Sequence, residues 1–173
     1  MWCEDELRFG QQGTNSRKWA PTGSRPPAIK QTKYDWLYVL GAICPATGQS
    51  VGMISPHIDA KIVSIFLQEM SRQIERNVHI VLIWDRAGFH SPHAVQVPEN
   101  ITLMPLPPYS PELNPTENLW HYLRSHYWSN REYEDWGALN DAVCSAWQET
   151  CLNPEKIRTI CNAPYLTERE VRV

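Results

Sequence analysis

No apolar run in this 173-residue chain approaches the ~20 residues that a membrane-spanning helix needs, so the sequence predicts no membrane association. The segment Met1-Trp2-Cys3-Glu4-Asp5-Glu6 lacks the basic and apolar regions of a secretory signal peptide. The five cysteines are odd in number and form no C-x-x-C pair, which disfavours a disulfide or zinc framework. These absences favour a reduced, cytoplasmic protein whose thiols are mostly packed in its core.

Acidic residues are missing from one long segment, Gly10 to Tyr34, although the whole chain has a net charge of −3. The segment is rich in turn-forming residues and is expected to be a long exposed loop. Trp19 within it is either a surface contact residue or, as we expect, an anchor in the core. Two interpretations stay open for it: a basic arm that meets an anion such as a phosphate backbone, or a solvated loop. Its five cations are Arg17, Lys18, Arg25, Lys30 and Lys33.

The remaining pattern, in a chain that is 42 % hydrophobic, predicts one α/β domain with a mixed sheet and no internal repeat. Apolar and β-branched runs indicate strands, and apolar positions at helical spacing indicate helices. We expect strands at 1–9, 34–43, 50–54, 78–84 and 101–106, and helices at 59–77, 114–127, 133–150 and 154–160.

A proline-rich loop, 106–115, leads into one of these helices. Asn114 suits the N-cap, Pro115 the first helical position, and Glu117 lies three residues after the cap. Glu117 is then either the returning half of a capping box on Asn114 or a carboxylate aimed into a site. The sequence leaves both open.

Three carboxylates stand at positions where a site could form. Asp85 directly follows an apolar strand, at the end where α/β sheets place their sites, and Asp5 lies on the first strand. Taken alone, Asp5 could be a surface acid and Asp85 a turn or cap residue. If both strands share one sheet, however, Asp5, Asp85 and Glu117 can converge, and such a group needs a hard divalent cation such as Mg²⁺ or Mn²⁺.

On these residues the chain resembles the catalytic domain of DDE superfamily transposases, in the bacterial insertion-sequence branch related to mariner elements. The resemblance covers residues 1 to about 150. The matching pieces are Glu4-Asp5-Glu6…Arg8-Phe9; Arg17-Lys18-Trp19-Ala20-Pro21…Gly23; Leu37-Tyr38-Val39-Leu40-Gly41-Ala42; Trp84-Asp85…Ala87…His90; and Leu106-Pro107-Pro108-Tyr109-Ser110-Pro111…Leu113-Asn114-Pro115…Glu117…Leu119-Trp120.

The resemblance implies a ribonuclease-H-like fold over residues 1–160, with a central mixed five-stranded sheet flanked by helices, and a C-terminal tail over 161–173. It implies a two-metal active site, with Asp5, Asp85 and Glu117 as catalytic residues and ligands of two Mg²⁺ or Mn²⁺ ions. That site would cleave and join DNA strands in cut-and-paste transposition.

The partners implied are transposon ends and target DNA, bridged by a homodimer in the bacterial cytoplasm at the nucleoid. Family members carry an N-terminal helix-turn-helix region, which we expect to be absent here, so this chain alone should not recognise element ends. Trp128, Tyr133 and Trp136 could form an interface or belong to the core.

Further candidate DNA contacts are Arg17, Lys18, Arg25, Lys30, Arg86 and His90, as phosphate-positioning residues and not as readers of bases. Arg86 stands where the family often has Asn or Gly, and the 31 residues between Asp85 and Glu117 are slightly fewer than is typical. His90 could orient a phosphate or simply pack its loop.

Two rival functions remain at this point. One is a ribonuclease-H-type nuclease acting on RNA–DNA hybrids. The other is a decayed or domesticated domain that keeps the fold but only binds DNA or a partner.

Overall fold

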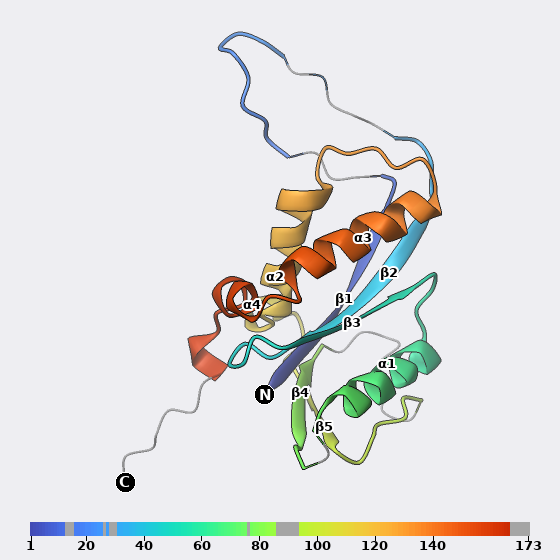
Figure 1. Cartoon of the computed structure of the whole chain (residues 1–173), viewed down its shortest axis with the longest axis vertical. Coiled ribbons are helices and arrows are strands. Elements are labelled where there is room, and N and C mark those ends of the chain that lie inside the picture. The colour runs from blue at the N-terminus through green and yellow to red at the C-terminus, as the bar shows by residue number, and fades with distance from the viewer. Residues whose placement is uncertain (13–15, 26, 28–30, 76, 86–93, 167–173) are drawn as a thin grey trace.

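The computed structural model describes residues 1–12, 16–25, 27, 31–75, 77–85 and 94–166. Within them lies a mixed five-stranded sheet with the strand order β3-β2-β1-β4-β5, flanked by helices (Figure 1). The predicted elements are confirmed within a few residues at each end. They are β1 (Trp2–Gly10), β2 (Trp36–Ile43), β3 (Ser50–Ser55), α1 (Ala60–Gln73), β4 (Ile80–Trp84), β5 (Ile101–Pro105), α2 (Thr116–Leu123), α3 (Trp136–Thr150) and α4 (Pro154–Ile160).

β1 is the central strand and joins the two halves of the sheet. It pairs antiparallel with β2 along its whole length from Cys3, and parallel with β4 at Trp2↔Leu82 and Cys3↔Ile83. β5 then pairs parallel with β4 at the outer edge. Extending the β1–β4 register by two residues sets Asp5 level with Asp85, the residue directly after β4.

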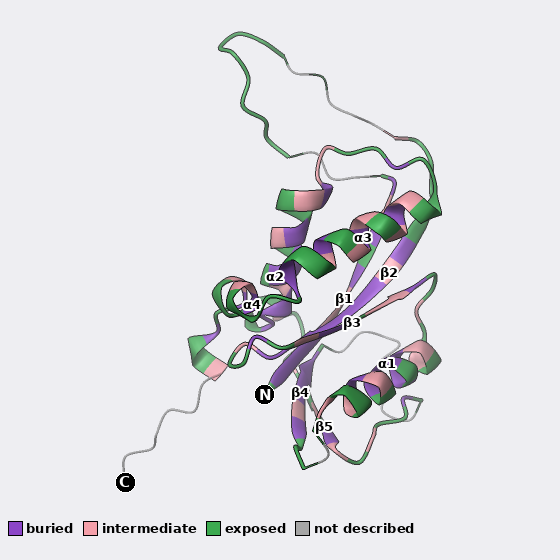
Figure 2. Cartoon of the chain, in the orientation of Figure 1, coloured by how far each residue is buried: buried purple, intermediate pink, exposed green. Residues whose placement is uncertain are grey.

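Both faces of the sheet are covered, so the domain has two hydrophobic clusters. Helices α2, α3 and α4 pack on one face with Leu119, Val143 and Ile157, whereas α1 packs on the other with Phe66 and Met70. In Figure 2 the central strands are largely buried, and exposed residues gather on the outer sides of α1 and α3. None of the helices in the described part of the chain combines the length and apolar character that crossing a bilayer demands.

Side-chain caps explain where two of the longer helices begin. Asp59 accepts a hydrogen bond from the Ile62 N–H at the start of α1, and Asp135 accepts one from the Ala138 N–H at the start of α3. With Asp135 as its N-cap, α3 therefore begins at Trp136, three residues after the predicted start.

The segment between β1 and β2 is a long arm whose base is fixed. Gln11 and Gln31, from its two ends, each donate a side-chain hydrogen bond to the Tyr133 carbonyl, at 2.8 and 2.7 Å. Gln11 also accepts from the Asp35 N–H. Beyond this base the described residues extend away from the sheet and are exposed (Figures 1 and 2).

The expected anchoring of Trp19 is wrong, because its side chain is fully exposed on this arm. Trp128, Tyr133 and Trp136 were each expected to lie either at an interface or in the core, and the structure places them differently. Trp128 and Tyr133 are buried around Phe9 in the core, whereas Trp136 is 40 % exposed. Packing around the base of the arm is therefore supplied by Trp128 and Tyr133, which leaves Trp19 outside.

The cysteines are free thiols, and four of the five are buried as predicted; only Cys144 is half-buried. Burial raises the pKa of Cys3 and of Cys161 to about 12, which suppresses thiolate formation. Cys161 and Ala163 are buried, and Leu166 packs against the hydrophobic cluster that contains Cys161, so the packed chain continues past residue 160, into the segment expected to be a tail.

Candidate active site

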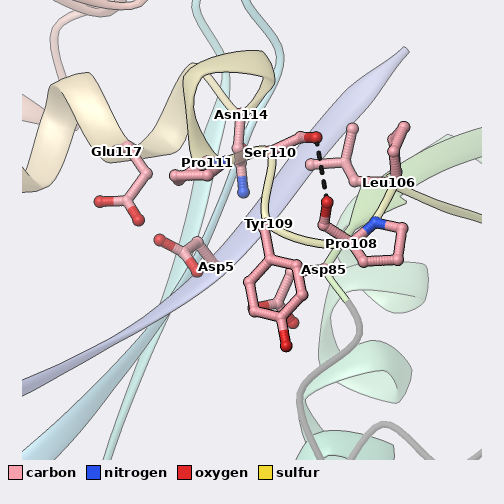
Figure 3. Close-up of a pocket in the computed structure, with 10 residues that line it drawn as sticks. Asp5, Asp85, Leu106, Pro108, Tyr109, Ser110, Pro111, Asn114 and Glu117 are labelled. Atoms are coloured by element: carbon pink, nitrogen blue, oxygen red, sulfur yellow. Dashed lines mark hydrogen bonds between the residues drawn. The ribbon is translucent and has the colours of Figure 1, made fainter.

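A cavity of about 400 Å³ lies where β1, the end of β4 and the start of α2 meet (Figure 3). All three predicted carboxylates line it: Asp5, Asp85 and Glu117. The proline-rich loop between β5 and α2 forms the rest of its wall, with Leu106, Pro107, Pro108, Tyr109, Ser110, Pro111 and Asn114. Three acids that are far apart in sequence thus border one hollow.

Hydrogen bonds tie the start of α2 directly to β1. The Asn114 side-chain N–H donates to the Glu4 carbonyl at 2.8 Å, and the Thr116 hydroxyl donates to the Cys3 carbonyl at 3.0 Å. Because these donors are buried and bind a central strand, the helix that carries Glu117 has a fixed position against the strand that carries Asp5.

The predicted N-cap is displaced by one residue. α2 begins at Thr116 with Pro115 in the cap position, and Asn114 lies one residue earlier, where its Oδ1 accepts from the Thr116 N–H at 3.2 Å. The Asn114 backbone N–H donates to the Pro111 carbonyl, so it is already paired within the loop and is not the partner of Glu117. Glu117 points into the cavity toward Asp5, which favours the site interpretation over the capping box.

The Asp5 carboxylate is half-buried and receives two hydrogen bonds. The Trp120 indole N–H donates to its Oδ2 at 2.8 Å, and the Glu6 backbone N–H also donates to it. Burial, followed by repulsion from Glu117 and Glu6, nevertheless raises the pKa of Asp5 to about 8. The cavity therefore favours a positive charge, either a proton on Asp5 or a cation between the acids.

The chemistry of the donor set fits a hard divalent cation, since the three acids offer only carboxylate oxygens. Within the described ranges, no three His, Cys, Asp or Glu side chains are already gathered closely enough to hold one ion. Asp5, Asp85 and Glu117 line a common cavity but are not gathered into a closed ligand set.

Tyr109 is the most unusual residue of the loop. Its φ of 57° lies in the left-handed region, which bulky residues rarely adopt, and its side chain is fully exposed at the mouth of the cavity (Figure 3). Backbone strain of this kind is typical of functional loops.

The predicted DNA contacts separate into two groups. Arg17, Lys18 and Arg25 are exposed on the arm. Lys30, Arg86 and His90 lie outside the described residues, so those three predictions are neither supported nor contradicted by the structure.

Sequence reasoning missed three residues that build this site, namely Asn114 and Thr116 as tethers to β1 and Trp120 as the donor to Asp5. One signal was present for Trp120: it follows Glu117 by three residues, and side chains at that spacing lie on the same helix face. For the tethers, no local pattern indicates a partner more than 100 residues away.

Comparison with known proteins identifies a family and a relative of this chain. Residues 1–140 match the sequence model of the family described as DDE superfamily endonuclease. A protein of Sinorhizobium fredii (strain NBRC 101917 / NGR234), "Uncharacterized protein y4pE/y4sA", is 42 % identical over 125 residues, which are 72 % of this chain and 93 % of that protein.

Solved structures of Mos1 transposase share the fold. The paired-end complex with the left transposon end and the mariner paired-end complex with Mn each align with a TM-score of 0.69 at 13 % identity. Each alignment covers 93 % of this chain and 51 % of the other, so the chain spans about half the length of the Mos1 chains. The expected ribonuclease-H-like fold, with its mixed five-stranded sheet, is confirmed. Together with the match over residues 1–140, these findings show that the chain belongs to the DDE superfamily endonuclease family.

Proposed function

We propose that this chain is a transposase catalytic domain that cleaves DNA strands and transfers them in cut-and-paste transposition. The single observation that carries the proposal is the convergence of Asp5, Asp85 and Glu117 on one cavity, from β1, the end of β4 and α2. Its membership of an endonuclease family supports phosphodiester chemistry at that cavity.

Asp5, Asp85 and Glu117 would hold two Mg²⁺ or Mn²⁺ ions. Two ions bound there would activate the attacking oxygen and stabilise the leaving oxygen of an in-line displacement at a phosphodiester. Burial, and after it repulsion from Glu117, raises the pKa of Asp5, and a cation in the cavity would relieve that repulsion. Mos1 mariner paired-end complexes with Mn and with Mg support the same class of metal here.

The chain's own residues provide a rigid frame for this chemistry. Asn114 and Thr116 fix the helix of Glu117 to β1, and the prolines of the neighbouring loop restrict the cavity wall. A frame that is fixed before the substrate arrives needs no reorganisation of the carboxylates during the reaction.

DNA is the proposed partner, with the basic arm as its phosphate-binding element. Arg17, Lys18 and Arg25 are exposed and no acid lies between Gly10 and Tyr34, which favours contact with phosphates. We assign Lys30, Arg86 and His90 the same role from the sequence alone. The active assembly we propose is a homodimer that bridges two transposon ends at the nucleoid. The exposed indole of Trp19 supports a contact there, either with DNA or with the second copy of the chain.

The test is cleavage of supercoiled plasmid by the purified chain in Mn²⁺. We expect nicked circles to accumulate, EDTA to stop the reaction, and Asp85→Ala to abolish it. Equal cleavage by wild type and Asp85→Ala would assign the activity to a contaminant and contradict the catalytic site.

A parallel substrate panel separates the rival functions. Preferential cleavage of RNA–DNA hybrids over plasmid would favour the ribonuclease-H-type nuclease. DNA binding without cleavage in Mg²⁺ or Mn²⁺ would favour a domain that has lost catalysis.

A further inference from the structure

Asp5 belongs to a row of residues that crosses the sheet from β1 to β3. It pairs with Gly41 of β2, and Gly41 pairs with Gly52 of β3. Gly41 and Gly52, the next two positions along this row, therefore carry no side chain. The backbone of β2 and β3 is accessible there to side chains from the helices that cover the sheet.

Two tryptophans fill that open surface. A Cβ added at Gly41 would lie 2.6 Å from Cη2 of Trp120, and one added at Gly52 would lie 2.5 Å from Cζ2 of Trp147. Such distances are shorter than any ordinary carbon contact, so both indoles approach the backbone more closely than an alanine would permit. The two rings also contact one another, with centroids 6.5 Å apart.

Trp120 is consequently held on several sides. Its side chain is 1 % exposed, the sheet at Gly41 lies beneath it, and Trp147 lies beside it. Close packing leaves such a ring a single orientation, and in that orientation its N–H reaches Asp5 Oδ2 at 2.8 Å.

We infer that Trp120 is a positioning residue: its indole N–H, held in place by the Gly41–Gly52 surface and Trp147, fixes the Asp5 carboxylate in the orientation in which it binds metal. A carboxylate offers about four acceptor positions, so bonds from Trp120 and the Glu6 N–H leave positions for a cation. Groups that orient a metal ligand in this way typically contribute 10–100-fold to metal affinity or activity.

Because this role of Trp120 rests on the proposed function of Asp5 as a metal ligand, the experiment measures both. Mn²⁺ binding to the full chain is followed by electron paramagnetic resonance of the free ion, which needs no DNA and no turnover. The test variant is Trp120→Phe, which keeps an aromatic ring but removes the N–H. We expect its Mn²⁺ dissociation constant to rise by about 10-fold.

The chain offers a matched control in Trp128→Phe. Trp128 is also buried, at 2 % exposure, and its N–H donates to the Ala142 carbonyl at 3.2 Å, away from the cavity. This variant loses the same atoms and one hydrogen bond, so it should lose comparable stability but retain Mn²⁺ affinity. Asp5→Ala serves as the reference for loss of the ligand.

The outcomes distinguish the two claims. If wild type binds no Mn²⁺, or Asp5→Ala binds it as tightly as wild type, the proposed function fails. If Asp5→Ala loses binding but Trp120→Phe matches Trp128→Phe, the positioning role of Trp120 is overturned. Should Trp120→Phe not fold, Gly41→Ala decides, because its methyl group displaces the indole without altering either partner; unchanged Mn²⁺ affinity in that variant would overturn the role.

Discussion

Glu117→Gln is expected to reduce Mn²⁺-dependent plasmid cleavage by about 10³-fold, which corresponds to about 4 kcal/mol of transition-state stabilisation. Glutamine has the size of glutamate and is equally compatible with a helix, so α2 should stay in place through Asn114 and Thr116. Only the charge and one metal-binding oxygen are lost. The measurement is the initial rate of nicking at saturating Mn²⁺, beside a thermal melt that verifies folding.

Glu112→Gln is the matched control for this variant. Glu112 belongs to the short 3₁₀ helix Pro111–Leu113 in the same loop, is exposed, and does not line the cavity. Its replacement makes the same change of charge and should leave the nicking rate within about twofold, the scale of a weak surface-charge effect. Equal losses in both variants would show that net charge, and not a specific ligand at Glu117, governs the activity.

The same substitution has a second, independent consequence at Asp5. Glu117 is the largest source of charge repulsion acting on that carboxyl. Removing it should therefore lower the pKa of Asp5, although burial will keep that pKa above the ordinary value of an aspartate. An unchanged pKa in Glu117→Gln, measured by NMR titration of the metal-free protein, would mean that the two carboxylates do not face one another.

Gly48→Ala is expected to lower the free energy of unfolding by about 3 kcal/mol, more than the glycine variant compared with it below. Two costs add here: strain of an alanine in the left-handed backbone region, and overpacking by its methyl group. Gly48 has a φ of +76° in the turn between β2 and β3. A Cβ there would lie only 2.2 Å from the Pro154 carbonyl oxygen, at the start of α4. Because backbone lies on both sides of this contact, no flexible side chain can move to relieve it. Urea denaturation measures the effect.

Gly23→Ala separates the two causes of that loss. Gly23 also has a positive φ, +84°, but nothing lies within 4 Å of an added Cβ. We expect this exposed turn on the arm to lose about 1–2 kcal/mol, the cost of backbone strain alone. If the two variants were equally destabilised, the contact between the β2–β3 turn and α4 would not be the cause.

The strands and the convergence of the acids could be predicted from sequence for a specific reason. Apolar runs such as 78–84 carry their own signal, and Asp85 is marked by its place directly after one of them. Strand order follows less directly, yet a parallel β1–β4 pair is what allows Asp5 and Asp85 to face one cavity. Glu117 was recognisable because proline and asparagine mark a helix start locally.

What the sequence could not provide depends on contacts between distant residues. Asn114 is a residue type that favours helix N-caps, but its buried side-chain amide donates a hydrogen bond to the Glu4 carbonyl, 110 positions away. Trp19 has the hydrophobicity of a core residue, yet the space at the base of the arm is filled by Trp128 and Tyr133. From sequence, Gly41 and Gly52 would be expected to weaken their strands. The structure shows that they make room for the indole rings of Trp120 and Trp147. Local propensity does not contain this information.

The most direct test of the proposed metal site is anomalous diffraction from crystals of the chain soaked in Mn²⁺. The proposal predicts two Mn²⁺ peaks in the cavity, with ligand oxygens from Asp5, Asp85 and Glu117, and their loss in Asp5→Ala crystals. Mn²⁺ bound only elsewhere on the protein, or peaks in the cavity that persist in Asp5→Ala, would contradict it.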